Sequence, residues 1–450
     1  MMTKRGGDRG KKSEEAMKKL REAAEAGDAQ AQYRLGFCLL YCVGCRRNLR
    51  EALKWLREAA RRGQPNARFE LGCCLTDGIG CKSNPKKAAK LFKKAAAGLR
   101  EGAERGNAEA QNDWGYALQY GLGCEPNPKE AVTWYRRAAR QVNLSGRCNW
   151  GYCLLHGVGC NKNPQQAVKL FRWAAEQGDL CGQNNLGYCF ESGLGCIHNP
   201  EEAVRWYRRA AERGLADAQY NWGCCILKGI GRPWSLQKAV VLFRKAARQG
   251  HAPARFKLGY CLRHGIGCNK NLEEAVIWYR KAAEQGDPDA QNNWGYCLYH
   301  GIGCEPNRQE AVIWYRKAAE QGDAAAQNNW GYCLQHGIGC EPNQQEAVIW
   351  YRRAAWQGVA QAQFHYGDCA RHIIGHAEAV KWYRRAAWQG HKEAQYRLGF
   401  CLQLGIGCDK NPEEAAQWYS RAARQGNEYA KEALRRLKPS LWTVFRSACH

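Results

Sequence analysis

Apolar residues follow a helical period along this chain, and the pattern returns every 36 residues. In the copy that spans residues 287–322, the side chains of Ala290, Trp294 and Leu298 fall at positions i, i+4 and i+8. This spacing places the three side chains on one face of an amphipathic helix. It predicts a first helix over Pro288–His300, whose apolar face packs against other helices.

Capping residues predict where the two helices of each copy begin and end. Asp287 can accept a free N–H group at the start of the first helix, and Gly301 can adopt the left-handed conformation that ends it. Pro306 and Asn307 open a second helix, and Gly322 ends it. Helices this short are unstable alone in water, so stacking between copies must stabilise them.

The same unit recurs along nearly the whole chain. A glycine in the middle of a helix costs about 1 kcal/mol relative to alanine, so its recurrence indicates that a neighbouring helix comes close. The steps between these anchoring glycines are 36 residues, except for 43 residues after Gly72 and 32 residues after Gly367. A regular period of this length is typical of a solenoid, which usually offers a binding surface. The eleven anchors are Gly36, Gly72, Gly115, Gly151, Gly187, Gly223, Gly259, Gly295, Gly331, Gly367 and Gly399.

The repeats also predict how the chain is divided. We expect a disordered basic N-terminus at 1–12, a repeat solenoid at 13–438 and an apolar tail at 439–450. Within the solenoid, 13–27 forms a capping helix, 28–426 the repeats and 427–438 a terminal helix. Seven extra residues around 97–104 are expected to lengthen a helix or loop. Four residues missing between His376 and Ala377 shorten the turn of the tenth copy and are expected to bend the array there.

The repeated motif AQxxxGxxxxxGxGxxxNxxEAVxWYRxAAxQG resembles the Sel1-like repeat, a relative of the tetratricopeptide repeat. The resemblance implies an all-α fold, a right-handed α-solenoid of about eleven helix-turn-helix repeats. It also implies that the first helices line a concave groove and that the second helices form the convex side. Members of this family mostly act as adaptors that assemble protein complexes. Some cysteine-rich members carry the name β-lactamase, which leaves a hydrolase as an alternative function.

Nineteen of the 25 cysteines occupy two positions of the repeat, two and nine residues after the anchoring glycine. Sel1-like repeats usually carry an apolar residue at the second position, which favours thiols that face the seam between helices. The two positions are both filled in eight copies. These pairs are Cys38/Cys45, Cys74/Cys81, Cys153/Cys160, Cys189/Cys196, Cys261/Cys268, Cys297/Cys304, Cys333/Cys340 and Cys401/Cys408.

Three interpretations of the cysteine pairs remain open. They can be reduced side chains of the core, since the sequence indicates a cytoplasmic protein with neither a signal peptide nor a membrane-spanning segment. They can form a disulfide within each repeat, which would place the protein in an oxidising compartment. Metal binding is the third, because a histidine such as His300 falls between Cys297 and Cys304. Such histidines also suit the last turn of a helix, so we expect no metal and no cofactor.

Two ladders of polar side chains follow the first helices. Asparagine can pair with a peptide backbone through its donor and its acceptor, and tyrosine offers a flat surface with a polar tip. The leading hypothesis is therefore a non-catalytic scaffold that binds a peptide or protein segment in the concave groove. Solvent-facing residues copied by duplication are the alternative. The predicted contact residues are Asn184, Asn185, Tyr188, Asn292, Asn293, Tyr296, Asn328, Asn329 and Tyr332.

The charge is unevenly distributed. Half of the net charge of +26 falls within residues 1–106. A dense lysine patch there suits either a solvated helix face or an acidic partner such as nucleic acid. The patch consists of Lys82, Lys86, Lys87, Lys90, Lys93 and Lys94.

Catalysis has little support in the sequence. The glycine-rich turns recur in nine copies without the Lys-Ser or Lys-Thr of a phosphate loop. We find no nucleophile motif and no carboxylate pair set apart from the repeats. The sequence does not indicate an oligomeric state.

Overall fold

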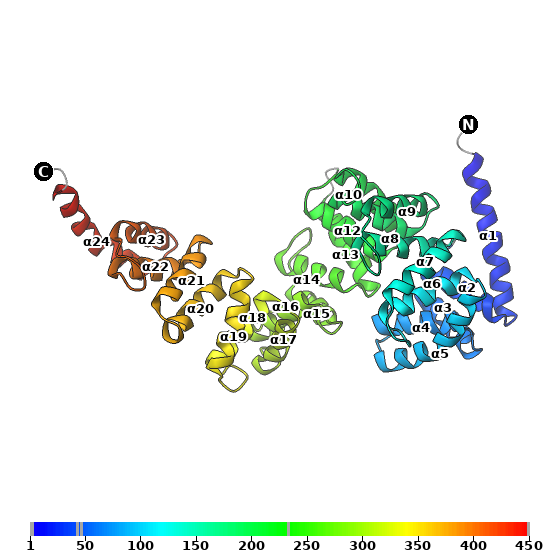
Figure 1. Ribbon diagram of the computed structural model, residues 1–450, viewed down its shortest axis with the longest axis horizontal. Helices are drawn as coiled ribbons and strands as arrows, with labels where there is room; N and C mark the ends of the chain where they lie inside the picture. The colour runs from blue at the N-terminus through cyan, green and yellow to red at the C-terminus, as the bar shows by residue number, and fades with distance from the viewer. Residues whose placement is uncertain (1–3, 42–44, 46–47, 232–234, 448–450) are drawn as a thin grey trace. The chain divides into compact units, whose positions relative to one another are not determined.

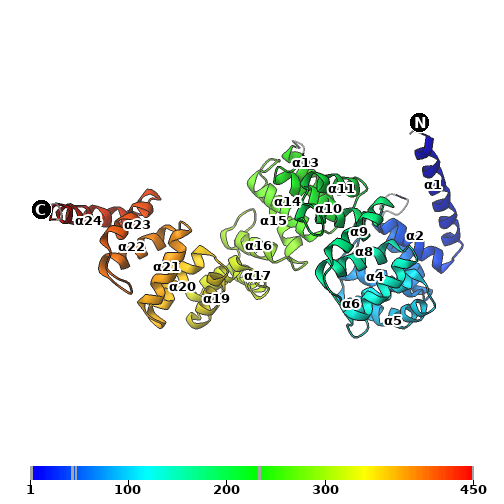
Figure 2. The same ribbon diagram turned by 45° about the horizontal axis from the view of Figure 1, so that its top comes forward.

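The computed structural model describes residues 4–41, 45, 48–231 and 235–447 (Figure 1). These residues form helices and turns and contain no strand. The chain divides into two compact units, Met1–Lys270 (unit 1) and Asn271–His450 (unit 2). Within each unit, consecutive helices pack as antiparallel pairs (Figure 1, Figure 2).

Unit 1 contains fourteen helices among its described residues. They are α1 (Lys4–Glu25), α2 (Ala29–Tyr41), α3 (Leu49–Arg61), α4 (Pro65–Asp77), α5 (Pro85–Glu104), α6 (Ala108–Tyr120), α7 (Pro128–Arg140), α8 (Leu144–His156), α9 (Pro164–Glu176), α10 (Leu180–Ser192), α11 (Pro200–Glu212), α12 (Ala216–Leu227), α13 (Leu236–Arg248) and α14 (Ala252–His264).

Unit 2 contains ten helices among its described residues. They are α15 (Leu272–Ala283), α16 (Pro288–His300), α17 (Arg308–Glu320), α18 (Ala324–His336), α19 (Gln344–Trp356), α20 (Ala360–Ile373), α21 (His376–Trp388), α22 (Lys392–Leu404), α23 (Pro412–Arg424) and α24 (Glu428–Ser447).

The predicted helix boundaries are confirmed in the copy at residues 287–322. The side chain of Asp287 accepts the N–H of Ala290 at 2.8 Å and caps α16, which spans the predicted residues. Gly301 ends α16 with a φ of 68°. Asn307 is the N-cap of α17, and its side chain accepts the N–H of Glu310 at 3.0 Å. Local hydrogen bonds therefore set the ends of both helices.

The close approach expected at the anchoring glycines is confirmed. A Cβ atom added to Gly295 would lie 3.0 Å from the ring of Tyr315 and 3.1 Å from the carbonyl oxygen of Ala311, both on α17. Ala318 and Ala319 of α17 are also buried. The glycine of the first helix and the tyrosine ring and alanines of the second helix thus fill the seam of this repeat.

Both departures from the regular spacing have a structural counterpart. The insertion lengthens a helix, because α5 has 20 residues where α7 and α9 have 13 each. The deletion shortens the turn between α20 and α21 to Ile374 and Gly375, and Gly375 has a φ of 121°. At the chain ends the helices run further than expected. The structure begins α1 at Lys4, within the stretch expected to be disordered, and continues α24 to Ser447. No proline interrupts the first of these extensions.

The first helices form the concave side of unit 1. From α2 to α10 each first helix touches the next one, whereas successive second helices in the described chain make no comparable contact. Curvature also brings side chains together two repeats apart. Nη2 of Arg34 on α2 lies 3.5 Å from Oε1 of Glu109 on α6. Among the described helices, none is long and apolar enough to cross a bilayer.

Candidate functional site

Asparagines of neighbouring repeats form a hydrogen-bonded ladder along the first helices. In each rung, the asparagine two residues before the anchoring glycine donates its Nδ2 to the asparagine three residues before the preceding anchor. The rungs join Asn149 to Asn112 (2.8 Å), Asn221 to Asn184 (2.9 Å) and Asn329 to Asn292 (2.9 Å). These side chains therefore hold neighbouring first helices in register and keep only part of their hydrogen-bonding capacity for a ligand.

The other predicted asparagines differ from one another. Asn293 donates its Nδ2 to the carbonyl oxygen of Asp289 at 2.8 Å. Asn328 is buried, and its Oδ1 accepts no hydrogen bond because His365 occupies the ladder position of the next repeat. Asn185 is half-buried, and the preceding ladder position holds Cys148 instead of asparagine. Within the part of the chain that the structure describes, the amide of Asn185 makes no hydrogen bond and remains available.

The tyrosine ladder lies on the surface of the first helices. Tyr188, Tyr296 and Tyr332 are between 36% and 41% exposed. The ring centroid of Tyr296 lies 4.2 Å from that of His300, one helical turn later. Such histidines stand in the last turn of their helices, as the sequence predicted. The surface of several first helices therefore presents the same pair of adjacent rings, a tyrosine and a histidine.

Unit 1 has a hollow on this face, with a volume of about 300 Å³. It is formed by four successive first helices, α6, α8, α10 and α12. Two of the predicted residues, Asn184 and Asn185, line it. Tyr116 and Tyr152 also line it and directly follow an anchoring glycine, as the other tyrosines of the predicted ladder do, whereas Tyr120, five residues after Gly115, was not predicted. The full lining is Tyr116, Gln119, Tyr120, Cys148, Asn149, Tyr152, Cys181, Asn184, Asn185, Leu215 and Asp217.

The lysine patch lies away from this hollow, on α5 and the turn before it. All six lysines, Lys82, Lys86, Lys87, Lys90, Lys93 and Lys94, are exposed. No acidic side chain among the described residues forms an ion pair with any of them. The patch thus concentrates positive charge without an ion-pair partner on α5, which is the second helix of its repeat.

The structure holds all sixteen side chains of the cysteine pairs as thiols, and the disulfide alternative stays a prediction. In the first pair, Sγ of Cys45 donates to the backbone carbonyl oxygen of Cys38 at 3.4 Å instead of bonding to the sulfur of that residue. In the pair Cys261/Cys268, Sγ of Cys268 donates to the carbonyl oxygen of Ile266 at 3.6 Å. The second thiol therefore serves as a hydrogen-bond donor to the helix end or the turn. The sixteen thiols are those of Cys38, Cys45, Cys74, Cys81, Cys153, Cys160, Cys189, Cys196, Cys261, Cys268, Cys297, Cys304, Cys333, Cys340, Cys401 and Cys408.

Within each pair the two thiols differ in burial. The first is buried in most pairs, and the second is half-buried against the helix seam. Burial, reinforced by the neighbouring Cys160, raises the pKa of Cys153 to about 12. Among the described residues, no three His, Cys, Asp or Glu side chains are placed to hold a metal ion. The arrangement thus fits thiols that pack between helices.

Unit 1 contains a pair of buried carboxyl groups. This pair was not predicted from the sequence, for which we expected no carboxyl pair set apart from the repeats. Glu70 on α4 and Asp113 on α6 are 5% and 4% exposed. The hydroxyl of Tyr41 donates to Glu70 at 2.9 Å, and Nδ2 of Asn112 donates to Asp113 at 3.1 Å. Burial raises the pKa of both carboxyls, and the charge of Asp113 raises that of Glu70 further. The sequence does contain a signal for this pair, because an acidic residue stands two residues before the anchoring glycine in two consecutive copies.

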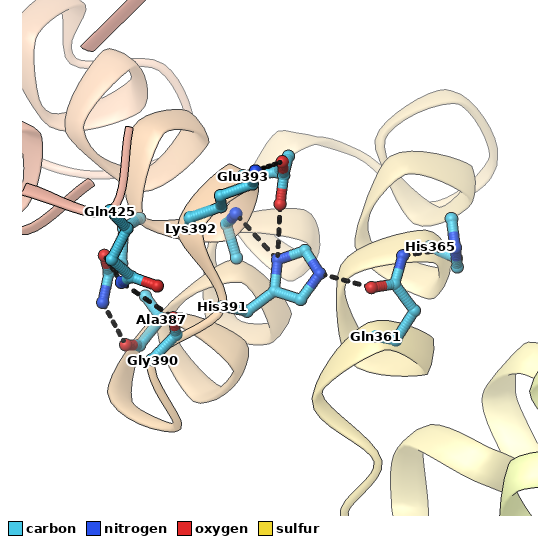
Figure 3. Close-up of polar contacts among 10 residues, drawn as sticks. Gln361, His365, Ala387, Gly390, His391, Lys392, Glu393 and Gln425 are labelled. Carbon is cyan, nitrogen blue, oxygen red and sulfur yellow. Dashed lines mark hydrogen bonds and ion pairs between the residues drawn. The ribbon is translucent and has the colours of Figure 1, made fainter. Parts of the chain in front are cut away.

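Histidines replace the usual polar residues at one place in unit 2. Nδ1 of His391 accepts the N–H of Ala394 at 3.1 Å and so caps α22. Nε2 of His391 lies 2.7 Å from Oε1 of Gln361, whose Nε2 lies 2.8 Å from Nε2 of His365 (Figure 3). Because Nδ1 accepts, the neutral ring of His391 carries its proton on Nε2 and donates it to Gln361. Burial lowers the pKa of His391, and lowers that of His365 to about 4.

Comparison with known proteins agrees with the helix pairs. The model of the Sel1 repeat matches residues 29–64, 65–98, 108–143, 145–179, 182–215, 216–251, 252–287, 288–323, 324–359, 360–391 and 392–427. No curated protein matches the chain. Among solved structures, the chain is similar to c5321, a protective antigen present in uropathogenic Escherichia coli strains displaying an SLR fold. The identity is 33%, the similarity covers 94% of this chain and 90% of that one, and the TM-score is 0.61.

A Sel1 repeat protein from Oxalobacter formigenes is also similar, with 27% identity over 76% of this chain and 89% of that chain, and a TM-score of 0.41. Eleven matches to one repeat model account for most of the chain, in register with the helix pairs of the structure. The chain therefore belongs to the Sel1 repeat family.

Proposed function

We propose that the first-helix face of unit 1 binds an extended peptide segment of a partner protein, so that the chain serves as an adaptor. Sel1 repeats generally form protein-interaction scaffolds, and a solenoid offers a continuous surface for this purpose. The observation that carries the proposal is the hollow across α6, α8, α10 and α12. It combines exposed rings with amide groups, which is the composition of adaptable peptide-binding surfaces.

The polar and apolar contacts of this site have separate roles. The free amide of Asn185 can donate to a backbone carbonyl of the peptide and accept from a backbone N–H. Tyr120 and Tyr152 are 51% and 41% exposed and line the same hollow. Their rings would cover an apolar side chain of the peptide. The rungs from Asn149 to Asn112 and from Asn221 to Asn184 would keep α8 beside α6 and α12 beside α10 while the peptide binds.

A displayed library of random peptides, selected on the full chain, tests this proposal. The double variant Asn185→Ala/Tyr152→Ala should lose at least about tenfold in affinity for the selected peptides, because it removes a hydrogen-bonding group and a ring that the peptide would cover. The matched control is Ile197→Ala, since Ile197 is 87% exposed in unit 1 and does not line the hollow. Equal affinity of the double variant and the control, with unchanged helical circular dichroism, would overturn the proposal.

The lysine patch supports a second candidate function, the binding of a polyanion such as nucleic acid. All six lysines are exposed and lack an ion pair with any described acidic residue. Contacts with phosphates release counterions, so binding of a single-stranded oligonucleotide should weaken steeply as salt is added. The variant Lys86→Gln/Lys90→Gln/Lys93→Gln should reduce that salt dependence. A salt dependence equal to that of the unmodified chain would exclude the patch.

Catalysis is not part of either proposal. The β-lactamase alternative rests on the name of relatives. Sγ of Cys148 donates to Oδ1 of Asp179 at 3.2 Å, but burial raises the pKa of this thiol and so disfavours a thiolate nucleophile. The carboxyl pair of Glu70 and Asp113 is buried and hydrogen-bonded within the protein, so it does not present a reactive group to a substrate.

A further inference from the structure

Two second helices of unit 2 end in exposed tryptophans. Trp356 is the last residue of α19 and Trp388 the last residue of α21. They are 68% and 66% exposed. The corresponding residue of α11 and of α17 is a glutamate, Glu212 and Glu320. The repeat therefore does not require an aromatic side chain there, and water-exposed indoles of this size call for a partner.

Each exposed indole is held by residues of the following repeat. The ring of Trp356 makes an edge-to-face contact with Trp382, with the centroids 5.3 Å apart. The guanidinium carbon of Arg385 lies 5.5 Å from the centroid of Trp356 and 4.4 Å from that of Trp382. These two contacts fix the orientation of the Trp356 ring and place a positive charge beside it.

The next repeat has the same arrangement. Trp388 meets Trp418 at 5.2 Å, and the guanidinium carbon of Arg421 lies 5.4 Å from Trp388 and 4.5 Å from Trp418. The exposed tryptophan and the neighbouring arginine thus occur as a pair in two consecutive repeats. We call the surface made by Ile349, Arg353, Trp356, Arg385, Trp388 and Arg421 the Trp–Arg face.

Aliphatic side chains extend this surface. Ile349, Arg353 and Trp356 stand at positions i, i+4 and i+7 of α19, which is one face of the helix. Ile349 is 43% exposed, and Ile313 at the same position of α17 is 53% exposed. Large apolar groups therefore alternate with cations on the outward side of these helices.

The charge of the Trp–Arg face is positive. Arg353, Arg385 and Arg421 are exposed and form no ion pair among the described residues. The acidic residues nearby are engaged elsewhere. Glu346 accepts the indole N–H of Trp350 at 3.2 Å, and Glu414 accepts that of Trp418 at 3.1 Å and pairs with Arg384.

We propose that the Trp–Arg face binds the surface of an anionic lipid bilayer. Indole and isoleucine side chains favour the boundary between headgroups and acyl chains, and arginines attract acidic headgroups. The isoleucines distinguish this partner from nucleic acid, because they offer no stacking surface for a base. An arginine also lies over each exposed indole, which leaves less of the ring for stacking. This inference is independent of peptide binding, since it concerns unit 2 and the second helices.

Co-sedimentation of the full chain with vesicles of phosphatidylcholine mixed with phosphatidylglycerol tests the proposal. The variant Trp356→Glu/Trp388→Glu should weaken vesicle binding at least about tenfold, because it replaces both indoles with negative charges. Its fold should be kept, since other copies carry glutamate there. The matched control Ile197→Ala changes an apolar side chain of unit 1 that is 87% exposed, and it should bind vesicles like the unmodified chain.

A second variant keeps the proposal testable if the first is unstable. Arg353→Gln/Arg385→Gln/Arg421→Gln retains the indoles and should weaken binding while reducing its salt dependence. Three results would overturn the proposal. The tryptophan variant could bind the mixed vesicles like the unmodified chain. Pure phosphatidylcholine vesicles could bind as well as the mixed ones. A single-stranded oligonucleotide could bind through these residues while the mixed vesicles do not.

Discussion

Nε2 of Gln321 donates a hydrogen bond to Oε1 of Gln291 at 2.7 Å, and this contact ties the second helix of a repeat to its first. Gln291 in turn donates its own Nε2 to the carbonyl oxygen of Ala283 at 3.2 Å, on the preceding second helix. Gln291 is only 4% exposed. One buried amide therefore links three helices, which accounts for the glutamines of the AQ and QG motifs in the repeats that carry both.

Replacing Gln291 with leucine should destabilise unit 2 by about 1–3 kcal/mol, because it leaves Gln321 and the carbonyl of Ala283 without their partner. Urea unfolding followed by circular dichroism measures the change. Gln183 provides the control. Its Oε1 accepts no hydrogen bond, since Arg213 stands where most repeats have the donating glutamine. Gln183→Leu should therefore cost less. An equal loss in the two variants would contradict the shared role of Gln291.

The glycines of the turns should differ in their sensitivity to alanine. A Cβ atom at Gly303 would lie 2.3 Å from the carbonyl oxygen of Leu272, whereas one at Gly322 would meet nothing within 4 Å. Both residues have a positive φ, of 69° and 97°. Gly322→Ala should cost about 1–2 kcal/mol for the left-handed backbone alone. Gly303→Ala should cost clearly more, because the backbone of α15 has to move. Thermal unfolding of the two variants compares them, and an inverted order would refute this packing.

The buried carboxyl pair should make unit 1 less stable as the pH rises. Because burial raises the pKa of Glu70 and Asp113 in the folded chain, the folded state holds protons that the unfolded state releases above about pH 4. Stability is thus greatest in mild acid and decreases toward alkaline pH. Other titratable groups interact with the pair, and the hydroxyl of Tyr41 donates to Glu70. These groups include Tyr33, Tyr41, Cys73, Glu109, Tyr116 and Tyr135.

Asp113→Asn should therefore raise the melting temperature at pH 8 and change it little at pH 5. Asparagine fits this position, because it occupies the same place in the repeat at Asn149. Melting curves across pH measure the difference between the two chains. A gain that is equal at both pH values would show that Asp113 does not titrate between them.

The histidines of unit 2 should make its stability depend on pH in the opposite direction. The pKa of His391 and of His365 is lowered by burial, so the unfolded chain binds more protons than the folded chain below about pH 6.5. Their contribution is complete above that pH and is lost as the pH falls toward about 4. Protonation of His391 also removes the acceptor that caps α22. The charged neighbours are Glu393, Lys392 and Asp368, with His336 facing His365.

His391→Asn should retain the cap and reduce the loss of stability in acid, since asparagine caps α6 and α8 in unit 1. Melting temperatures between pH 7 and pH 4 test this, with His156→Asn as a control in an exposed last turn. If the variant and the unmodified chain lose stability in parallel, His391 is not the responsible group.

The thiols should react in the order of their exposure. Cys181 is exposed, whereas the other described cysteines are buried or half-buried. Burial raises the pKa of Cys153 and Cys333 to about 12, so these side chains hold little of the reactive thiolate at neutral pH. Iodoacetamide should label Cys181 first and the other two only after unfolding. Mass spectrometry of the unfolded chain without reductant should count 25 reduced thiols. A lower count would indicate that the pairs form disulfides.

The sequence by itself determined the repeat, the helices and their ends. Asp287, Gly301 and Asn307 act on residues that are near in sequence, so their effect is visible in one copy of the motif. The anchoring glycine also predicted the close contact with the second helix, because a glycine inside a helix has a cost that only packing offsets.

Only the tertiary structure decided which side chains the repeats share and which they leave exposed. The bond from Asn329 to Asn292 and the proximity of Glu70 to Asp113 join different repeats. Such contacts depend on the rotation and spacing between stacked helices, which a motif within one repeat does not encode. The same holds for Trp356, whose exposure follows from how the next repeat packs beside it.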